Sequence, residues 1–199
     1  MQKEVYFSRR NLPHIYIPNS TYFITFRLKG SIPQTQLKKL IAWKKSLKQA
    51  NSNAEKYKQD LILFGKYDKL LHNNRKNNYL INPIIAKIVA SQMHKYDNKE
   101  YTLICYSIMP NHVHVVFSLL ENSKTIDKIM QTIKRVSAYQ ANKILGKGGS
   151  FWQSESYDHI VRDDNELQRI VNYTLYNPVK AKLADDWKEW KFNYLKYEK

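Results

Sequence analysis

YTLICYSIMPNHVHVVFSL, residues 101–119, carries the clearest strand pattern in the chain. Tyr101–Ile108 and His112–Leu119 are rich in β-branched and aromatic residues, which favours strands. Pro110 and Asn111 interrupt the run, as turn residues do. The stretch therefore predicts two strands joined as a hairpin.

The second of these strands carries a His-x-His pair. Side chains on a strand alternate between its faces, so His112 and His114 share one face. Val113, Val115 and Phe117 then pack on the other face. Two imidazoles on one rigid strand form half of a metal site. The alternative is a half-buried strand with two solvent-facing histidines, and the pair alone does not separate the two.

Strand and helix patterns alternate on both sides of this hairpin. We expect a strand at Thr21–Lys29, a helix from Gln34 to about Gln49 and partial helix within residues 50–80. Further helices are expected at Ile84–Tyr96 and at Thr125–Leu145. A loop and a strand are expected within Phe151–Val161, followed by a helix that begins at the capping pair Asp163 and Glu166. This order predicts an α+β fold, with a ferredoxin-like or RRM-like antiparallel sheet and helices on one face.

The length of 199 residues suits a single domain. Within it we expect an irregular N-terminal arm at 1–20, a helical basic insertion at 50–100 and a C-terminal tail at 185–199. Cys105 is the only cysteine and cannot form an internal disulfide, which indicates a reducing compartment. No secretory signal and no apolar run near 18 residues is present, so we expect a cytoplasmic protein without a membrane partner.

The charge is strongly basic, with 33 Lys and Arg against 17 Asp and Glu and a formal net charge of +16. Lys38–Lys76 carries a net charge of +8, and Lys124–Lys147 carries +5. The chain also contains 15 Tyr, 4 Trp and 7 Phe, and cations interleaved with aromatic rings suit unpaired bases and phosphates. Nucleic acid is the expected partner; the alternative is a basic protein with no dedicated partner.

Tyr173 and Asn177 offer a second half for the histidine site. They are spaced i, i+4 on the last predicted helix and lie on one face of it. Two imidazoles, an amide oxygen and a phenol suit a divalent cation, Mg²⁺ or Mn²⁺, beside a nucleophile. In the alternative interpretation, Tyr173 packs in the core and Asn177 caps the helix before Pro178.

Four ordered motifs resemble the REP-associated tyrosine transposases, which belong to the single-tyrosine HUH superfamily. The motifs are MPNHVHVVF, IKRVSAYQANK, FWQSESYDHIVRD and YTLYNPVKAKL, and the resemblance runs from about Thr21 to Leu183, including YDKLL and AKIVASQM. It implies a fold of the HUH endonuclease type and a divalent metal held by His112 and His114. It also implies that Tyr173 is the nucleophile and that Asn177 is a polar metal ligand four residues later. Thr174 departs from the aliphatic residue usual after the tyrosine.

The resemblance implies a metal-dependent transposase and endonuclease that nicks and rejoins single-stranded DNA through a 5′-phosphotyrosine. REP-like hairpins are the expected substrate, in a nucleoid-associated monomer or homodimer. Tyr157 is the competing nucleophile, interpreted as structural or DNA-contacting. No role is expected for His72. The candidate DNA-binding residues are Lys128, Lys134, Arg135, Trp152, Gln153, Tyr157, His159 and Lys180.

Three alternatives stay open. The first is a non-catalytic single-stranded nucleic-acid-binding module on the same fold, in which sheet aromatics stack on bases. The second is a metal-dependent nuclease in which water attacks and no covalent intermediate forms. The third is a host-retained protein that cuts DNA but no longer mobilises it. The sequence shows no general base for Tyr173 and does not indicate which hairpin is recognised.

Overall fold

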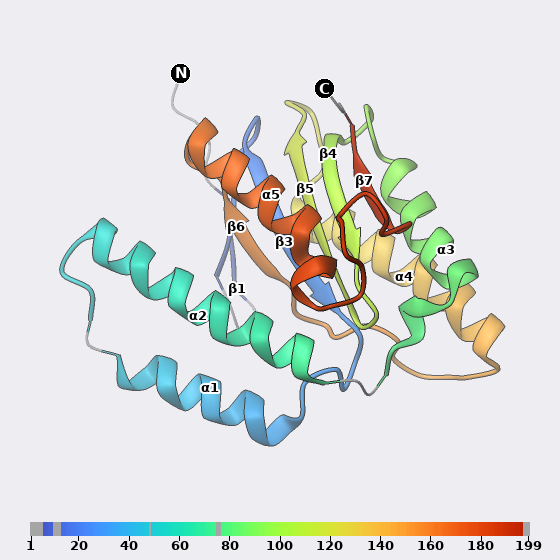
Figure 1. The fold of residues 1–199 in the computed structure, drawn as a ribbon. Helices are drawn as coiled ribbons and strands as arrows, with labels where there is room; N and C mark the ends of the chain where they lie inside the picture. Colours follow the sequence, from blue (N-terminus) through green and yellow to red (C-terminus); the bar gives the residue numbers. More distant parts are fainter. Residues whose placement is uncertain (1–5, 10–12, 48, 75–76, 197–199) are drawn as a thin grey trace.

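The computed structural model describes residues 6–9, 13–47, 49–74 and 77–196 (Figure 1). A five-stranded antiparallel sheet lies at its centre, in the order β6-β3-β5-β4-β7. The strands are β3 (Thr21–Arg27), β4 (Tyr101–Ile108), β5 (His112–Leu119), β6 (Tyr157–Ile160) and β7 (Asn193–Leu195). The bounds of β4 and β5 are those predicted, and the two strands pair as the expected hairpin.

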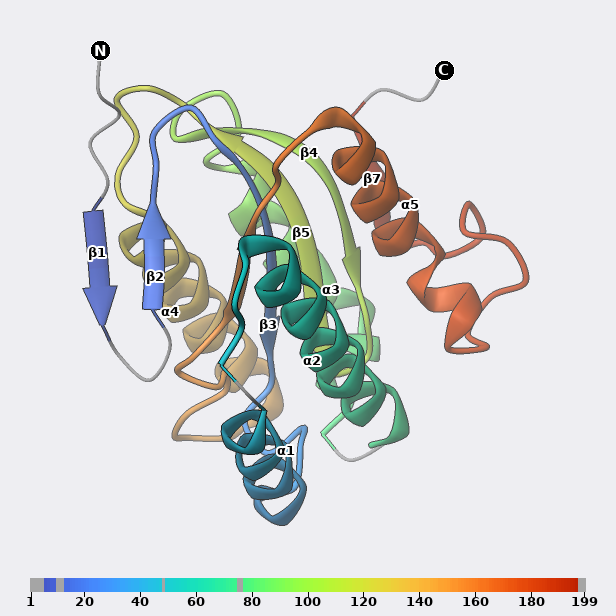
Figure 2. The ribbon, with the colours of Figure 1, turned by 90° about the vertical axis from the view of Figure 1, so that its left-hand side faces the viewer.

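Helices cover both faces of the sheet (Figure 2). α3 (Pro83–His94) and α4 (Ile126–Leu145) pack on one face, as the ferredoxin-like prediction requires. α5 (Asp164–Lys180) and α2 (Asn53–Asn73) lie on the opposite face, which the prediction left bare. α1 (Gln34–Ser46) packs against α2, and the short helix η1 (Tyr79–Ile81) precedes α3.

Alternation along the strands divides the buried side chains between these two layers. Val113, Val115 and Phe117 of β5 pack in the larger core under α3 and α4, as predicted. The opposite face holds a smaller cluster in which Phe23, Cys105 and Val116 pack against Val171 and Leu175 of α5. β5 therefore presents His112 and His114 to the layer formed by α5 and α2.

Capping residues fix where the helices begin and end. The side chain of Ser52 accepts a hydrogen bond from the backbone of Glu55 at the start of α2. Asp163 accepts one from the Glu166 amide at the start of α5, confirming one half of the predicted capping pair. Gly146 ends α4 in the left-handed conformation, at φ 59°.

One expectation at the N-terminal end needs correction. The arm at 1–20 is not irregular throughout, because β1 (Tyr6–Arg9) and β2 (Pro13–Tyr16) pair antiparallel; residues 1–5 and 10–12 lie outside the described part. Near the other end, Pro178 lies within the last turn of α5, which ends at Lys180. The tail contributes β7, which extends the sheet beside β4.

Candidate active site

The two histidines of β5 are fully buried and converge on one point. His112 is 1% exposed and His114 is 0% exposed, so the solvent-facing alternative is wrong. Nε2 of His112 lies 3.1 Å from Nε2 of His114. Burial lowers the pKa of His112 well below its ordinary value, and burial also lowers the pKa of His114. Both imidazoles are therefore neutral at neutral pH, the form that binds metal ions.

Asn111 fixes the tautomer of His112. The amide nitrogen of Asn111 donates to the carbonyl oxygens of Leu71, at 3.0 Å, and Asn74, at 2.8 Å. The amide oxygen of Asn111 thus faces Nδ1 of His112, 2.6 Å away, and can only accept. Nδ1 must carry the proton, which leaves a lone pair on Nε2 directed into the site.

Thr25 of β3 makes the corresponding contact to His114. Its hydroxyl lies 2.7 Å from Nδ1 of His114. A hydroxyl that accepts from Nδ1 leaves Nε2 of His114 with a lone pair as well. Because Nε2 of His112 is unprotonated, the 3.1 Å contact between the two Nε2 atoms requires His114 to donate from Nε2 and to accept from Thr25 at Nδ1. Binding of a metal ion at Nε2 of His114 requires the other tautomer, in which Nδ1 donates to Thr25.

Helix α2 brings a carboxylate and a third imidazole to the same point. Oδ1 of Asp68 lies 3.4 Å from Nε2 of His114, and Oδ2 lies 3.8 Å from Nε2 of His72. Asp68 is 2% exposed. Burial by itself raises the pKa of Asp68, but the side chain of His114, which faces Oδ1, outweighs burial and holds the pKa below its ordinary value. Ligand atoms of Asp68, His72 and His112 all lie within 4.8 Å of one another.

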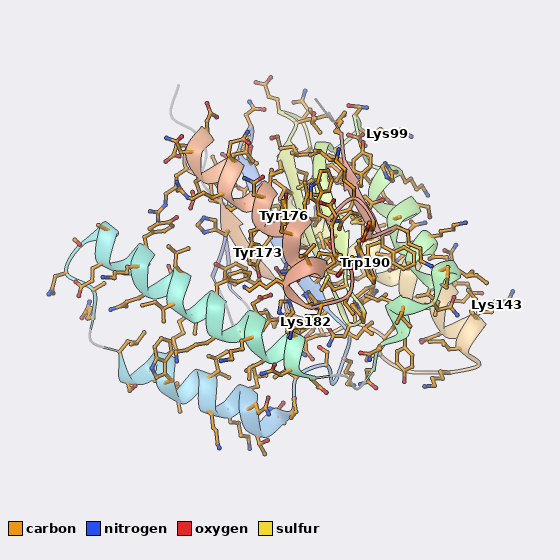
Figure 3. All side chains as sticks on the ribbon, viewed as in Figure 1. Lys99, Lys143, Tyr173, Tyr176, Lys182 and Trp190 are labelled. Carbon is orange, nitrogen blue, oxygen red and sulfur yellow. The ribbon has the colours of Figure 1, made fainter. Side chains whose placement is uncertain are left out.

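α5 contributes Tyr173 and Asn177 from the other side of the site. The Tyr173 ring lies 5.5 Å from the His114 ring and 5.7 Å from the Phe64 ring, centroid to centroid. Figure 3 shows Tyr173 between α5 and α2. Burial raises the pKa of Tyr173, and the nearby Asp68 carboxylate raises it further. Its hydroxyl is buried and makes no hydrogen bond of normal geometry within the described part of the chain.

Asn177 is fully buried rather than a helix cap. Its Oδ1 lies 2.8 Å from Nε2 of His72, which links α5 to α2. Among the described residues, its Nδ2 has no hydrogen-bond partner, and the same holds for Oδ1 of Asp68. Buried polar atoms without partners are uncommon in folded proteins and indicate a ligand or ion that completes them. One cluster here contains three such atoms, counting the Tyr173 hydroxyl.

The sequence was compared with models of known protein families. Residues 64–176, more than half of the chain, match the model of the family described as "Transposase IS200 like". The chain belongs to this transposase family. The matched range contains the histidine pair, Asp68, His72 and Tyr173.

Two further comparisons agree with this family. A protein of Haemophilus influenzae, provisionally named a REP-associated tyrosine transposase, is 22% identical over 147 residues, or 69% of this chain and 83% of its own. The solved structure of a REP-associated tyrosine transposase bound to a REP hairpin shares the fold, with a TM-score of 0.60 and 17% identity. The alignment covers 93% of this chain and 82% of that one. Across the described residues, no helix of the transposase is long and apolar enough to span a membrane.

The structure divides the candidate DNA-binding residues of the transposase between the two faces of the sheet. α4 carries Lys128, Lys134 and Arg135 on the face opposite His114, and Lys134 donates to the carbonyl oxygens of Gln153 and Ser154. A groove of about 410 Å³ runs between α4 and the segment 149–156 and is lined in part by Lys134, Arg135 and Gln153. α4 and the groove therefore lie on the other side of the sheet from α5 and Tyr173.

Trp152 and His159, both candidate DNA-binding residues, make polar contacts within the protein. Trp152 is 6% exposed, and its Nε1 donates to Ser137, so the indole is a core residue rather than a surface for stacking on bases. Nε2 of His159 lies 3.0 Å from the Glu166 carboxylate, and His159 is half-buried.

Tyr157 and Lys180 lie near Tyr173. The Tyr157 ring is 4.6 Å from the Phe64 ring, and burial raises its pKa. Nζ of Lys180 lies 3.9 Å from Oδ2 of Asp68 and 5.3 Å from the centre of the Tyr173 ring. Its side chain is 62% exposed, so the amine can reach a phosphate that approaches from solvent.

Asp68 was not singled out from the sequence and no role was expected for His72, yet the structure places both side chains beside His112. The signal was present in YDKLLH, where the two residues are spaced i, i+4 and so share one face of a helix. What the sequence did not reveal is where this helix docks, because about 40 residues separate it from the histidine pair.

Proposed function

We propose that this transposase nicks and rejoins single-stranded DNA, with Tyr173 as the nucleophile and a 5′-phosphotyrosine as the intermediate. The observation that carries the proposal is the packing of Tyr173 against His114 within one chain, at 5.5 Å between ring centroids. A second copy of the chain is not needed to bring the nucleophile and the histidine pair together. The chemistry is therefore available to a monomer and also to each subunit of a homodimer.

Tyr173 attacks the scissile phosphorus in the first step. A bond forms between the phenolic oxygen and phosphorus, the bond from phosphorus to the 3′-oxygen breaks, and the 3′-oxygen leaves as a hydroxyl. The raised pKa keeps the Tyr173 hydroxyl protonated at rest, so its proton must depart as the new bond forms. Attack by a 3′-hydroxyl on the phosphotyrosine reverses these changes, and the strand is rejoined without ATP.

The residues around the histidine pair fit a divalent ion. His112 offers an unprotonated Nε2, and Asn177 offers an amide oxygen whose second lone pair remains available beside its contact with His72. We propose His112, His114 and Asn177 as ligands of Mg²⁺ or Mn²⁺. When bound, such an ion polarises the scissile phosphate and stabilises the charge that develops on its oxygens.

A REP-like hairpin is the proposed substrate. The provisionally named relative and the solved structure support it, since the latter protein is bound to a REP hairpin. The net charge of +16 favours any polyanion, and the exposed amine of Lys180 suits the phosphate next to Tyr173. We place the protein in the cytoplasm, on the nucleoid.

Covalent trapping tests this function directly. Labelled single-stranded hairpin DNA from the flanks of the gene is incubated with wild type, Tyr173→Phe, Tyr157→Phe or His112→Ala, with Mn²⁺ or with a chelator. Denaturing protein gels then report any covalent adduct. We expect an Mn²⁺-dependent adduct in wild type and Tyr157→Phe that is lost in the other two variants.

The other outcomes separate the alternatives. Loss of the adduct only in Tyr157→Phe would assign the nucleophile to Tyr157. Cleavage to free 5′-phosphate without an adduct would indicate attack by water. Tight binding of the hairpin with neither cleavage nor adduct would favour the non-catalytic binding module.

A further inference from the structure

Helix α2 lies outside the βαββαβ core of the sheet, yet it places a carboxylate beside the histidine pair. Asp68 is 2% exposed, and its two oxygens contact the imidazoles of His114 and His72 at 3.4 and 3.8 Å. The nearest amine, Nζ of Lys180, lies 3.9 Å from Oδ2, and that lysine side chain is 62% exposed. These contacts are too long for strong charge-assisted hydrogen bonds, which measure about 2.7–2.9 Å.

The buried carboxylate of Asp68 has no close, oppositely charged partner among the described residues. Within the described residues, Oδ1 of Asp68 makes no hydrogen bond of normal geometry. Burying a charged group without close partners is costly, so Asp68 needs a compensating charge. A divalent cation bound by the lone pairs on His112 and His114 would supply that charge.

The donor set also suits an ion. Ligand atoms of Asp68, His72 and His112 lie within 4.8 Å of one another, and Nε2 of His114 is 3.1 Å from Nε2 of His112. His72 is already engaged with Asn177, whereas Oδ1 of Asp68 faces His114. Two imidazoles and one carboxylate form a set that favours a transition ion such as Mn²⁺ over Mg²⁺.

We propose that Asp68 is a ligand of the divalent ion, so that α2 completes a metal site begun by the two histidines of β5. This inference rests on the proposed function for the presence of an ion and extends it by assigning a negatively charged ligand. A ligand on α2 couples metal binding to the docking of that helix, because the ion binds the docked arrangement more tightly. The inserted helix is thereby part of the catalytic site and not only a cover over it.

Calorimetric titration with Mn²⁺, in the absence of DNA, tests the assignment without any readout of activity. The proteins are full-length wild type, Asp68→Asn, Asp68→Glu and Asp60→Asn. Asp60→Asn is the matched control, because it removes one negative charge from the same helix outside the cluster. Circular dichroism and thermal unfolding without metal verify that each variant is folded.

We expect Asp68→Asn to bind Mn²⁺ at least about tenfold more weakly than wild type. Asp60→Asn should match wild type, and Asp68→Glu, which keeps the charge, should bind more tightly than Asp68→Asn. The rise in melting temperature on adding Mn²⁺ should be equal for wild type and Asp60→Asn and smaller for Asp68→Asn than for Asp68→Glu. This second measurement tests the assignment even if Asp68→Asn is too unstable for calorimetry.

Two results would overturn the assignment for different reasons. Equal Mn²⁺ affinity in wild type and Asp68→Asn would remove Asp68 from the metal site and leave the proposed function intact. No Mn²⁺ binding by wild type would remove the ion itself, and with it the metal dependence in the proposed function. The covalent adduct with Tyr173 would still be tested separately by trapping.

Discussion

At the scale of single residues, the histidine pair depends on buried groups that hold its outer nitrogens. Asn111 holds Nδ1 of His112, and Thr25 holds Nδ1 of His114. From the sequence, Asn111 was interpreted only as a turn residue, and Thr25 lies on a strand that is about 90 residues away along the chain. Metal-binding histidines generally depend on such partners for ring orientation, so these two residues belong to the site as much as the imidazoles do.

Thr25→Val tests this dependence. Valine keeps the shape of threonine but removes the hydroxyl, so the buried Nδ1 of His114 loses its partner. We expect a loss of about 1–3 kcal/mol in the free energy of unfolding. We also expect Mn²⁺ affinity to fall about tenfold or more.

The matched control is Thr21→Val on the same strand. Thr21 also bonds a side chain of β5, but its partner is Ser118, 2.7 Å away and outside the site. Thr21→Val should leave Mn²⁺ affinity unchanged, and an equal loss of affinity in both variants would contradict the role assigned to Thr25. Denaturant unfolding and calorimetry provide the two measurements.

At the scale of elements, Glu166 fastens α2 to the start of α5. Its carboxylate accepts hydrogen bonds from the Tyr57 hydroxyl of α2 and from the Arg162 amide, and it lies 3.0 Å from Nε2 of His159. Arg162 also lies over the Tyr57 ring, 3.7 Å from its centre. The contacts of Tyr57 with Glu166 and Arg162 therefore attach the first half of α2 to the start of α5. In the second half of α2, Asp68 lies against His114 of β5.

Glu166→Gln should therefore remove a pH-dependent part of the stability. Burial raises the pKa of Glu166, but the bonds from Tyr57, Arg162 and His159 outweigh burial and hold the pKa below its ordinary value. A lowered pKa adds stability above about pH 4.3, and this stability is lost as the pH falls through the folded-state value. We expect the variant to be about 1–3 kcal/mol less stable at pH 7, with the difference closing in acid.

Urea unfolding of wild type and Glu166→Gln between pH 3 and pH 7 gives this difference. Glu121→Gln is the control, because Glu121 is exposed at the turn after β5. A difference between wild type and Glu166→Gln that stays constant over the whole pH range would contradict the electrostatic account.

Elements with a long regular pattern could be predicted from sequence with their bounds, whereas the four-residue β6 was expected only within a wider range and the three-residue β7 was not expected. β4 and β5 were placed to the residue because eight-residue strands with a turn between them give a strong local signal. β7 has three residues and depends on pairing with β4, which no local pattern encodes. Tyr173 and Asn177 could be proposed from i, i+4 spacing, whereas the docking of α2 that adds Asp68 is a tertiary contact.

At the scale of the whole molecule, the two basic regions lie on opposite sides of the sheet. α2 shares a face with Tyr173 and carries the exposed lysines Lys58, Lys66 and Lys69. α4 lies on the other face and carries the exposed Lys128, Arg135 and Lys143. A strand whose phosphate reaches Tyr173 and Lys180 runs along the first face, so the α2 lysines lie along it and the α4 cations do not.

The salt dependence of DNA binding distinguishes the two faces. Each phosphate neutralised on single-stranded DNA steepens the slope of log affinity against log salt by about 0.7. Replacing Lys58, Lys66 and Lys69 together by Gln should therefore reduce the slope by about 2 for an oligonucleotide without a hairpin. The matched triple at Lys128, Arg135 and Lys143 removes the same charge from α4 and should change the slope little. Fluorescence anisotropy across a salt series measures both, and the reverse ranking would place the scissile strand on the α4 face, away from Tyr173.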